Sequence, residues 1–126
     1  MAANVKDILA AANQAVPRLT PDQARAKMRE GDVVIVDVRD PPEVAQSGKI
    51  KGAVNISRGM LEFRADPEIP SYNPALQKEK TVLVYCGSGG RSALSGKVLK
   101  DMGYRSVFNI GGFKELADSG IETEPA

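Results

Sequence analysis

The sequence predicts an α/β fold, a small parallel-sheet domain with helices on both faces, from two observations. Runs rich in β-branched residues alternate along the chain with segments of helical periodicity, which is the order expected of a parallel sheet with crossover helices. The apolar run at 33–38, interrupted only by Asp37, indicates a strand covered on both faces. The 126 residues are enough for one domain with a single core.

The chain begins with an expected amphipathic helix over residues 1–17, because its apolar side chains recur at helical spacing. A signal peptide is not expected there, since the segment lacks a basic start followed by an uninterrupted apolar run. Residues 18–19 can form a short edge strand. A second helix follows, with Thr20 and Gln23 forming a capping box at its start, and it ends at Gly31.

After the strand at 33–38, prolines and Glu43 favour the first turn of a short helix that ends at Ser47. Glycines then bracket a turn that leads to a short strand at 53–56. Prolines cut every helical pattern short between residues 57 and 80. We expect a long surface connection there and a candidate wall beside the reactive loop described below, because long loops are often functional.

The second half of the chain continues the alternation. The expected elements are a strand at 81–85, a helix at 92–102, a strand at 107–110 and a short helix at 113–118. We therefore divide the chain into an N-terminal amphipathic helix at 1–17, a domain at 18–120 and a polar C-terminal tail at 121–126.

The composition excludes several classes of site. Basic and acidic residues nearly balance, 17 against 16, so we expect no nucleic-acid partner and no membrane-binding face. The chain has no histidine and one cysteine, which excludes Cys–His and Ser–His–Asp constellations, an intramolecular disulfide and cysteine-rich zinc sites. We expect no metal and no cofactor. The lone cysteine suits a reducing compartment and no apolar run could span a membrane, so we expect a cytoplasmic protein.

The only cysteine, Cys86, follows the strand at 81–85 and precedes a glycine-rich turn and a helical pattern. In parallel sheets, ligands bind at the carboxyl ends of the strands. Backbone N–H groups of such a turn point inward and form a socket for an anion. These surroundings lower the pKa of a thiol from about 8.5 to roughly 3.5–7.5 and favour a thiolate nucleophile. The alternative is a buried apolar cysteine whose glycines merely permit a tight turn.

Six residues after Cys86 share a capacity to approach or bind an anion. The glycines allow close approach of the backbone, the serines add hydroxyl donors, and the arginine supplies a positive charge. They are Gly87, Ser88, Gly89, Gly90, Arg91 and Ser92.

Several segments together carry a family pattern. They are Asp37-Val38-Arg39 with Glu43, residues 48–56, Tyr85-Cys86-x-x-Gly89-x-Arg91-Ser92, residues 102–104, and Gly111-Gly112-Phe113. This pattern resembles the rhodanese family of sulfurtransferases in its single-domain form, over roughly residues 19–116, and it implies a rhodanese-like fold. Two positions depart from it. Lys49 stands where the family commonly has histidine, and Leu116 where it often has tryptophan.

The resemblance implies that Cys86 takes a sulfane sulfur from a small donor such as thiosulfate and becomes a persulfide. The sulfur then passes to cyanide or a thiol. By the same resemblance, the loop amides hold the persulfide and Arg91 binds the sulfonate of thiosulfate. Asp37 and Arg39 would lie beneath the loop and orient it. The alternative for Arg39 and Glu43 is a structural ion pair that ties the first strand to the sheet.

Other functions stay open at this stage. The fold also resembles that of dual-specificity phosphatases of the cell-cycle type, whose loop has five residues between cysteine and arginine. Only four residues separate Cys86 from Arg91, and the smaller ring suits one sulfur atom better than a phosphate. Arsenate reduction would usually need a second thiol. A non-catalytic regulatory module and a persulfide carrier for a sulfur-accepting protein are the remaining alternatives.

Overall fold

Four parallel strands form the central sheet of the molecule, which a computed structural model describes over residues 2–126. The strands are β1 (Val33–Asp37), β3 (Val54–Asn55), β4 (Thr81–Cys86) and β5 (Ser106–Gly112), in the order β3-β1-β4-β5. The pairing register sets Asp37 beside Tyr85 and Cys86 beside Gly112. The carboxyl ends of β1, β4 and β5 therefore meet at one edge of the sheet.

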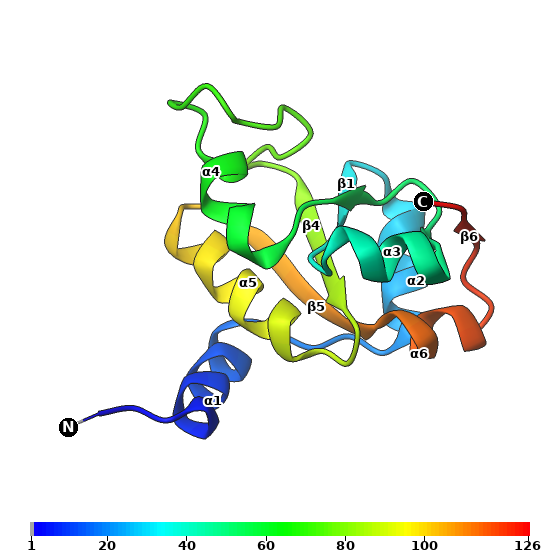
Figure 1. Ribbon diagram of the computed structural model, residues 1–126, viewed down its shortest axis with the longest axis horizontal. Coiled ribbons are helices and arrows are strands. Elements are labelled where there is room, and N and C mark those ends of the chain that lie inside the picture. Colours follow the sequence, from blue (N-terminus) through cyan, green and yellow to red (C-terminus); the bar gives the residue numbers. More distant parts are fainter. Residues whose placement is uncertain (1) are drawn as a thin grey trace.

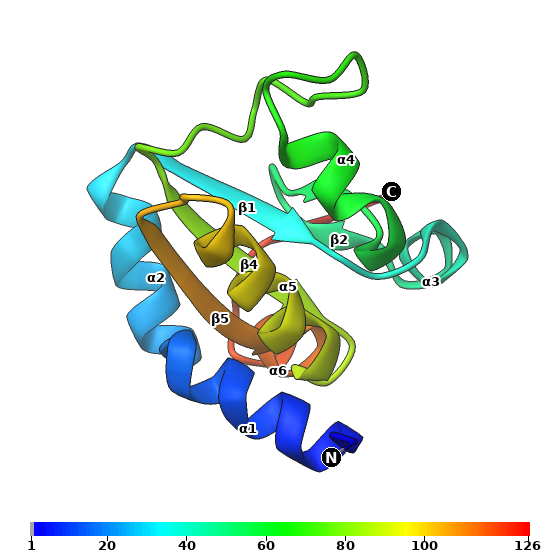
Figure 2. The same cartoon turned by 90° about the vertical axis from the view of Figure 1, so that its left-hand side faces the viewer.

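Helices cover both faces of this sheet, as the sequence predicts. On one face lie α1 (Val5–Ala15), α4 (Leu61–Ala65) and α5 (Gly90–Asp101), and on the other α2 (Pro21–Glu30) and α6 (Phe113–Asp118). Figure 1 shows α5 between α1 and α4, and Figure 2 shows α2 and α5 on opposite sides of the strands. Side chains of β4 alternate between two apolar clusters, with Val84 facing the α5 side and Leu83 the α2 side.

The capping box predicted for α2 is confirmed. The backbone N–H of Gln23 donates to Thr20 Oγ1 at 3.2 Å, and that of Thr20 donates to Gln23 Oε1 at 2.9 Å. Gly31 follows the helix as its C-cap with φ +80°. The edge strand expected at 18–19 is reduced to one parallel bridge between Arg18 and Asn109.

Two elements beside the cysteine are longer than expected. Helix α5 begins at Gly90 rather than Ser92, because Gly89 adopts φ +107° and turns the chain directly from the loop into the helix. Strand β5 continues through Gly111 and Gly112. The loop between β4 and α5 is therefore only three residues long, Gly87 to Gly89.

The segment at 57–80 differs from the expected surface connection. It contains a 3₁₀ turn, η1 (Arg58–Met60), and α4, and it contributes three fully buried side chains to the core: Leu61, Ala65 and Leu76. The backbone N–H of Arg105, next to the start of β5, donates to Lys78 O at 3.2 Å. This end of the segment lies at the amino ends of the strands (Figure 1), whereas Cys86 is the last residue of β4, so this end does not form the expected wall.

The tail at 121–126 carries a strand that sequence periodicity does not predict. β6 (Thr123–Glu124) pairs antiparallel with β2 (Lys49–Ile50), and Ile121 is buried. Lys49 forms an ion pair with Glu124, whose carboxylate also accepts the Gly52 N–H at 2.9 Å. The lysine that departs from the family pattern thus holds the C-terminal segment in place. The remaining helix, α3, covers Pro41–Ser47.

Candidate active site

The Cys86 sulfur lies at the carboxyl end of β4 inside the loop that leads to α5. The residue is 1% exposed. The backbone N–H of Gly89 donates to Sγ at 3.0 Å, and Ser92 Oγ lies 3.4 Å from Sγ. One backbone N–H of the loop thus donates directly to the sulfur, and the Ser92 hydroxyl lies beside it.

These contacts control the ionisation of the thiol. Burial by itself raises the pKa of Cys86, because it disfavours the charged form. Hydrogen bonds to the sulfur outweigh burial and lower the pKa below its ordinary value. The lowering effects come from the Ser92 side chain, whose Oγ lies 3.4 Å from Sγ, and from the backbone N–H groups of Ser92, Gly89 and Ser88. The loop amides and one hydroxyl therefore favour the thiolate without a histidine.

Asn109, in β5, holds this loop through its side chain, and the sequence analysis missed it. Its Oδ1 accepts the Ser92 hydroxyl at 2.8 Å and the Gly111 N–H at 3.0 Å. Its Nδ2 donates to Gly89 O at 3.0 Å. The side chain is buried in β5, so one amide links the loop, the start of α5 and the end of the strand. A polar residue within an apolar strand is the signal that could have identified it.

The loop packs tightly on the end of β5. A Cβ atom on Gly112 would lie 2.4 Å from Gly87 O, so no larger residue fits there without moving the loop. Gly87 and Ser88 are exposed, whereas Gly89 is buried. The outer part of the loop is therefore open to solvent while its inner part is fixed against the sheet.

Arg91 reaches the loop but is paired with a carboxylate. Its Nη1 and Nη2 donate to the Glu43 carboxylate at 2.7 and 2.9 Å, with the two side chains 38% and 41% exposed. The bond from Arg91, together with the Asp40 N–H, lowers the pKa of Glu43 to about 2. Nη2 also lies 3.1 Å from the position of a Cβ atom on Gly87. The positive charge expected at the loop is present and largely balanced by Glu43.

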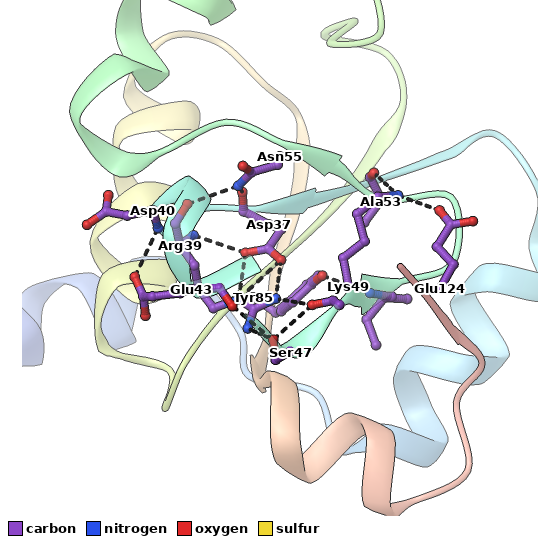
Figure 3. A network of polar contacts seen from close by, with 12 residues as sticks. Asp37, Arg39, Asp40, Glu43, Ser47, Lys49, Ala53, Asn55, Tyr85 and Glu124 are labelled. Atoms are coloured by element: carbon purple, nitrogen blue, oxygen red, sulfur yellow. Dashed lines mark hydrogen bonds and ion pairs between the residues drawn. The ribbon is translucent and has the colours of Figure 1, made fainter. Parts of the chain in front are cut away.

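Asp37 and Arg39 form a separate buried network (Figure 3). Arg39 Nη2 donates to Asp37 Oδ2 at 2.7 Å, and the guanidinium also donates to Ser47 Oγ and Gly48 O, each at 2.8 Å. It lies 4.4 Å from the ring centre of Phe113. These bonds tie β1 to the end of α3. The alternative of an ion pair between Arg39 and Glu43 is not what the structure has, because Arg39 pairs with Asp37 and Glu43 with Arg91.

Within residues 2–126 no cluster of three histidine, cysteine or acidic side chains could hold a metal ion. Over the same residues, no helix is both long and apolar enough to cross a membrane.

Comparison with known proteins shows which family the chain resembles. A family model described as the rhodanese-like domain matches residues 20–119. The chain is 37% identical over 82 residues to thiosulfate sulfurtransferase PspE of Escherichia coli, covering 65% of this chain and 72% of that protein. It is also 37% identical over 91 residues to a sulfurtransferase of Allochromatium vinosum, covering 71% and 77% of the two chains.

Two solved structures extend the comparison. One is a protein of unknown function from Rhodopseudomonas palustris, described as a possible tyrosine phosphatase. It is 42% identical, with a TM-score of 0.90, over 98% of this chain and 96% of that one. The other is the polysulfide-sulfur transferase homodimer of Wolinella succinogenes. It is 32% identical, with a TM-score of 0.74, over 94% of this chain and 85% of that one.

Proposed function

Because the chain belongs to the rhodanese-like family, we propose that it is a sulfurtransferase in which Cys86 carries a sulfane sulfur as a persulfide. One observation carries the proposal: the Gly89 N–H donates to Cys86 Sγ at 3.0 Å inside a loop of donors. A thiolate stabilised in this way is a nucleophile at neutral pH. The same donors suit the terminal sulfur of a persulfide, which is also an anion.

In the first half-reaction the Cys86 thiolate attacks the outer sulfur of thiosulfate. A sulfur–sulfur bond forms to Cys86, the bond between the two sulfur atoms of thiosulfate breaks, and sulfite leaves with the electron pair. No proton and no external oxidant or reductant is needed. Arg91, in the first turn of α5, binds the sulfonate in this proposal while it keeps its contact with Glu43.

In the second half-reaction an acceptor attacks the terminal sulfur of the persulfide. With cyanide the products are thiocyanate and the restored Cys86 thiolate. With a thiol, as a thiolate, the sulfur moves to form a persulfide on the acceptor. Splitting the transfer into two steps through a covalent intermediate is nucleophilic catalysis.

Cysteine-phosphatase chemistry is the second candidate, because the Rhodopseudomonas palustris relative is described as a possible tyrosine phosphatase. The loop argues against it. Four residues separate Cys86 from Arg91, one fewer than in the phosphatase loop, and the smaller ring suits one sulfur atom better than a phosphate. Hydrolysis of p-nitrophenyl phosphate that depends on Cys86 would favour this candidate.

The test is the formation of thiocyanate from thiosulfate and cyanide. We expect steady turnover by the native protein and none by Cys86→Ser, with sulfite released in equal amount. Phosphatase activity without thiocyanate would refute the proposal. A physiological acceptor that is a protein, and a cytoplasmic location, stay predictions.

A further inference from the structure

A second arginine, Arg18, lies against the cysteine loop. Its Nη1 is 2.6 Å from the position that a Cβ atom on Gly89 would take, and its Nη2 is 3.0 Å from the corresponding position on Gly111. Gly89 is the residue whose N–H donates to Cys86 Sγ. The Arg18 guanidinium therefore lies beside the residue whose backbone N–H holds the sulfur. Arg18 precedes the residues matched by the family model, 20–119.

The backbone around Arg18 is fixed to the sheet. It forms a parallel bridge with Asn109, in which the Leu19 N–H donates to Asn109 O and the Asn109 N–H donates to Pro17 O, each at 3.0 Å. Asn109 also holds Gly89 and Ser92 through its side chain. The same residue thus positions the loop and the base of the Arg18 side chain.

Arg18 is the less neutralised of the two arginines at the loop. Arg91 makes two short hydrogen bonds to Glu43. The carboxylate facing Arg18, that of Glu115, lies 3.7 Å from Nη2, and the two side chains are 50% and 55% exposed. Among residues 2–126 no hydrogen bond joins this pair. The Arg18 guanidinium can therefore bind an anion with little competition from the Glu115 carboxylate.

We infer that Arg18 is a substrate-binding residue, which holds the anionic group of the sulfur donor on the Gly89 side of the loop. This inference rests on the proposed function and deepens it. Arg91 Nη2 lies beside Gly87 and Arg18 Nη1 beside Gly89, so the loop has a guanidinium group next to each of these two glycines. The negative charge of Glu115 weakens binding of the donor, because it partly balances the positive charge of Arg18.

The first experiment measures the KM for thiosulfate. Arg18→Gln raises it about tenfold with little change in kcat, since the lost interaction is one charge-assisted contact. Glu115→Gln lowers it. Arg29→Gln is the matched control: it removes an exposed arginine from the last turn of α2, at the other end of the sheet. An unchanged KM in Arg18→Gln, or equal increases in Arg18→Gln and Arg29→Gln, overturns the inference.

A second experiment does not depend on sulfur transfer. Cys86 is alkylated with iodoacetate, which is an anion, and with iodoacetamide, which is neutral and of similar size. We expect the rate with iodoacetate divided by the rate with iodoacetamide to fall severalfold in Arg18→Gln and to stay constant in Arg29→Gln. An equal ratio in native protein and Arg18→Gln contradicts the inference. If the native protein does not turn over thiosulfate, the proposed function is refuted. The ratio of alkylation rates then still decides whether Arg18 attracts an anion to Cys86.

Discussion

Arg91 donates both terminal nitrogens to the carboxylate of Glu43, at 2.7 and 2.9 Å, across 48 residues of sequence. This pair connects the first turn of α5, directly after the cysteine loop, to α3, whose N-terminal capping box is completed by the same Glu43 side chain. Glu43 therefore holds the Arg91 guanidinium near the loop and at the same time partly balances its positive charge.

Replacement of Glu43 by Gln keeps a hydrogen-bond acceptor beside Arg91 but removes the balancing charge. We expect the KM for thiosulfate to fall about threefold, because Arg91 then interacts more strongly with a dianion. Glu62→Gln, which removes a carboxylate that pairs with Arg58, serves as the control. An increase of KM in Glu43→Gln would show that Arg91 needs the carboxylate for its position.

The same pair predicts how stability depends on pH. The pKa of Glu43 is lowered to about 2, so its stabilising effect is complete above the ordinary pKa of 4.5 and is lost as pH falls through 2. Glu43→Gln should therefore lower the free energy of unfolding at pH 7 by less than about 1 kcal/mol, because the pair is partly exposed. The difference should shrink in urea titrations as pH falls from 4.5 through 2, and a difference that stays constant over that range would contradict the assignment.

Ser92 is expected to tune the thiol. Ser92→Ala removes the hydroxyl that lies 3.4 Å from Sγ and lowers the pKa of Cys86, so this pKa should rise toward its ordinary value. The pH dependence of the iodoacetamide reaction rate measures this shift. Ser95→Ala is the control, because Ser95 is also buried in α5 but donates to Arg91 O instead. The same rise in both variants would rule out a specific role for Ser92.

Asn109 is expected to contribute to both stability and activity. Asn109→Leu keeps the volume but leaves the Ser92 hydroxyl, Gly89 O and Gly111 N–H without their partner. We expect a loss of about 2–4 kcal/mol in the free energy of unfolding, together with a lower kcat in the fraction that stays folded. Asn13→Leu, on the exposed side of α1, is the control. A stable and fully active Asn109→Leu would refute this role.

Substitution of Arg39 tests whether this residue supports the fold or acts in the reaction. Its bonds go to Asp37, Ser47 and Gly48, so Arg39→Met leaves the Asp37 carboxylate buried without its partner. Breaking a buried pair in this way costs about 3–5 kcal/mol of stability. Under conditions where the variant is folded, as monitored by circular dichroism, kcat should stay near the native value. A selective loss of kcat at native stability would instead support the orienting role implied by the family resemblance.

The sequence predicts those parts of the molecule that depend on local order. The β-branched run at 33–38, the capping box at Thr20 and the glycines after Cys86 each determine the conformation of neighbouring residues. The parallel sheet follows from their alternation. The position of Cys86 at a strand end could therefore be predicted before any contact was known.

Contacts across long sequence separations could not be predicted in this way. Glu43 could have paired with Arg39, four residues away, and only the fold brings Arg91 to it. Strands β2 and β6 have two residues each, too few for a periodic pattern, and they are joined across the whole domain. Residues 57–80 carry too many prolines to show a helix period, yet Leu61 and Leu76 complete the core.

The most direct test of the account is the mass of the intact protein after incubation with thiosulfate. We expect a gain equal to one sulfur atom on the native chain, located on the peptide that contains Cys86 and removed by cyanide. Cys86→Ser should gain no mass. A gain that persists in Cys86→Ser, or a native chain that stays unmodified while thiocyanate forms, would contradict a Cys86 persulfide as the intermediate.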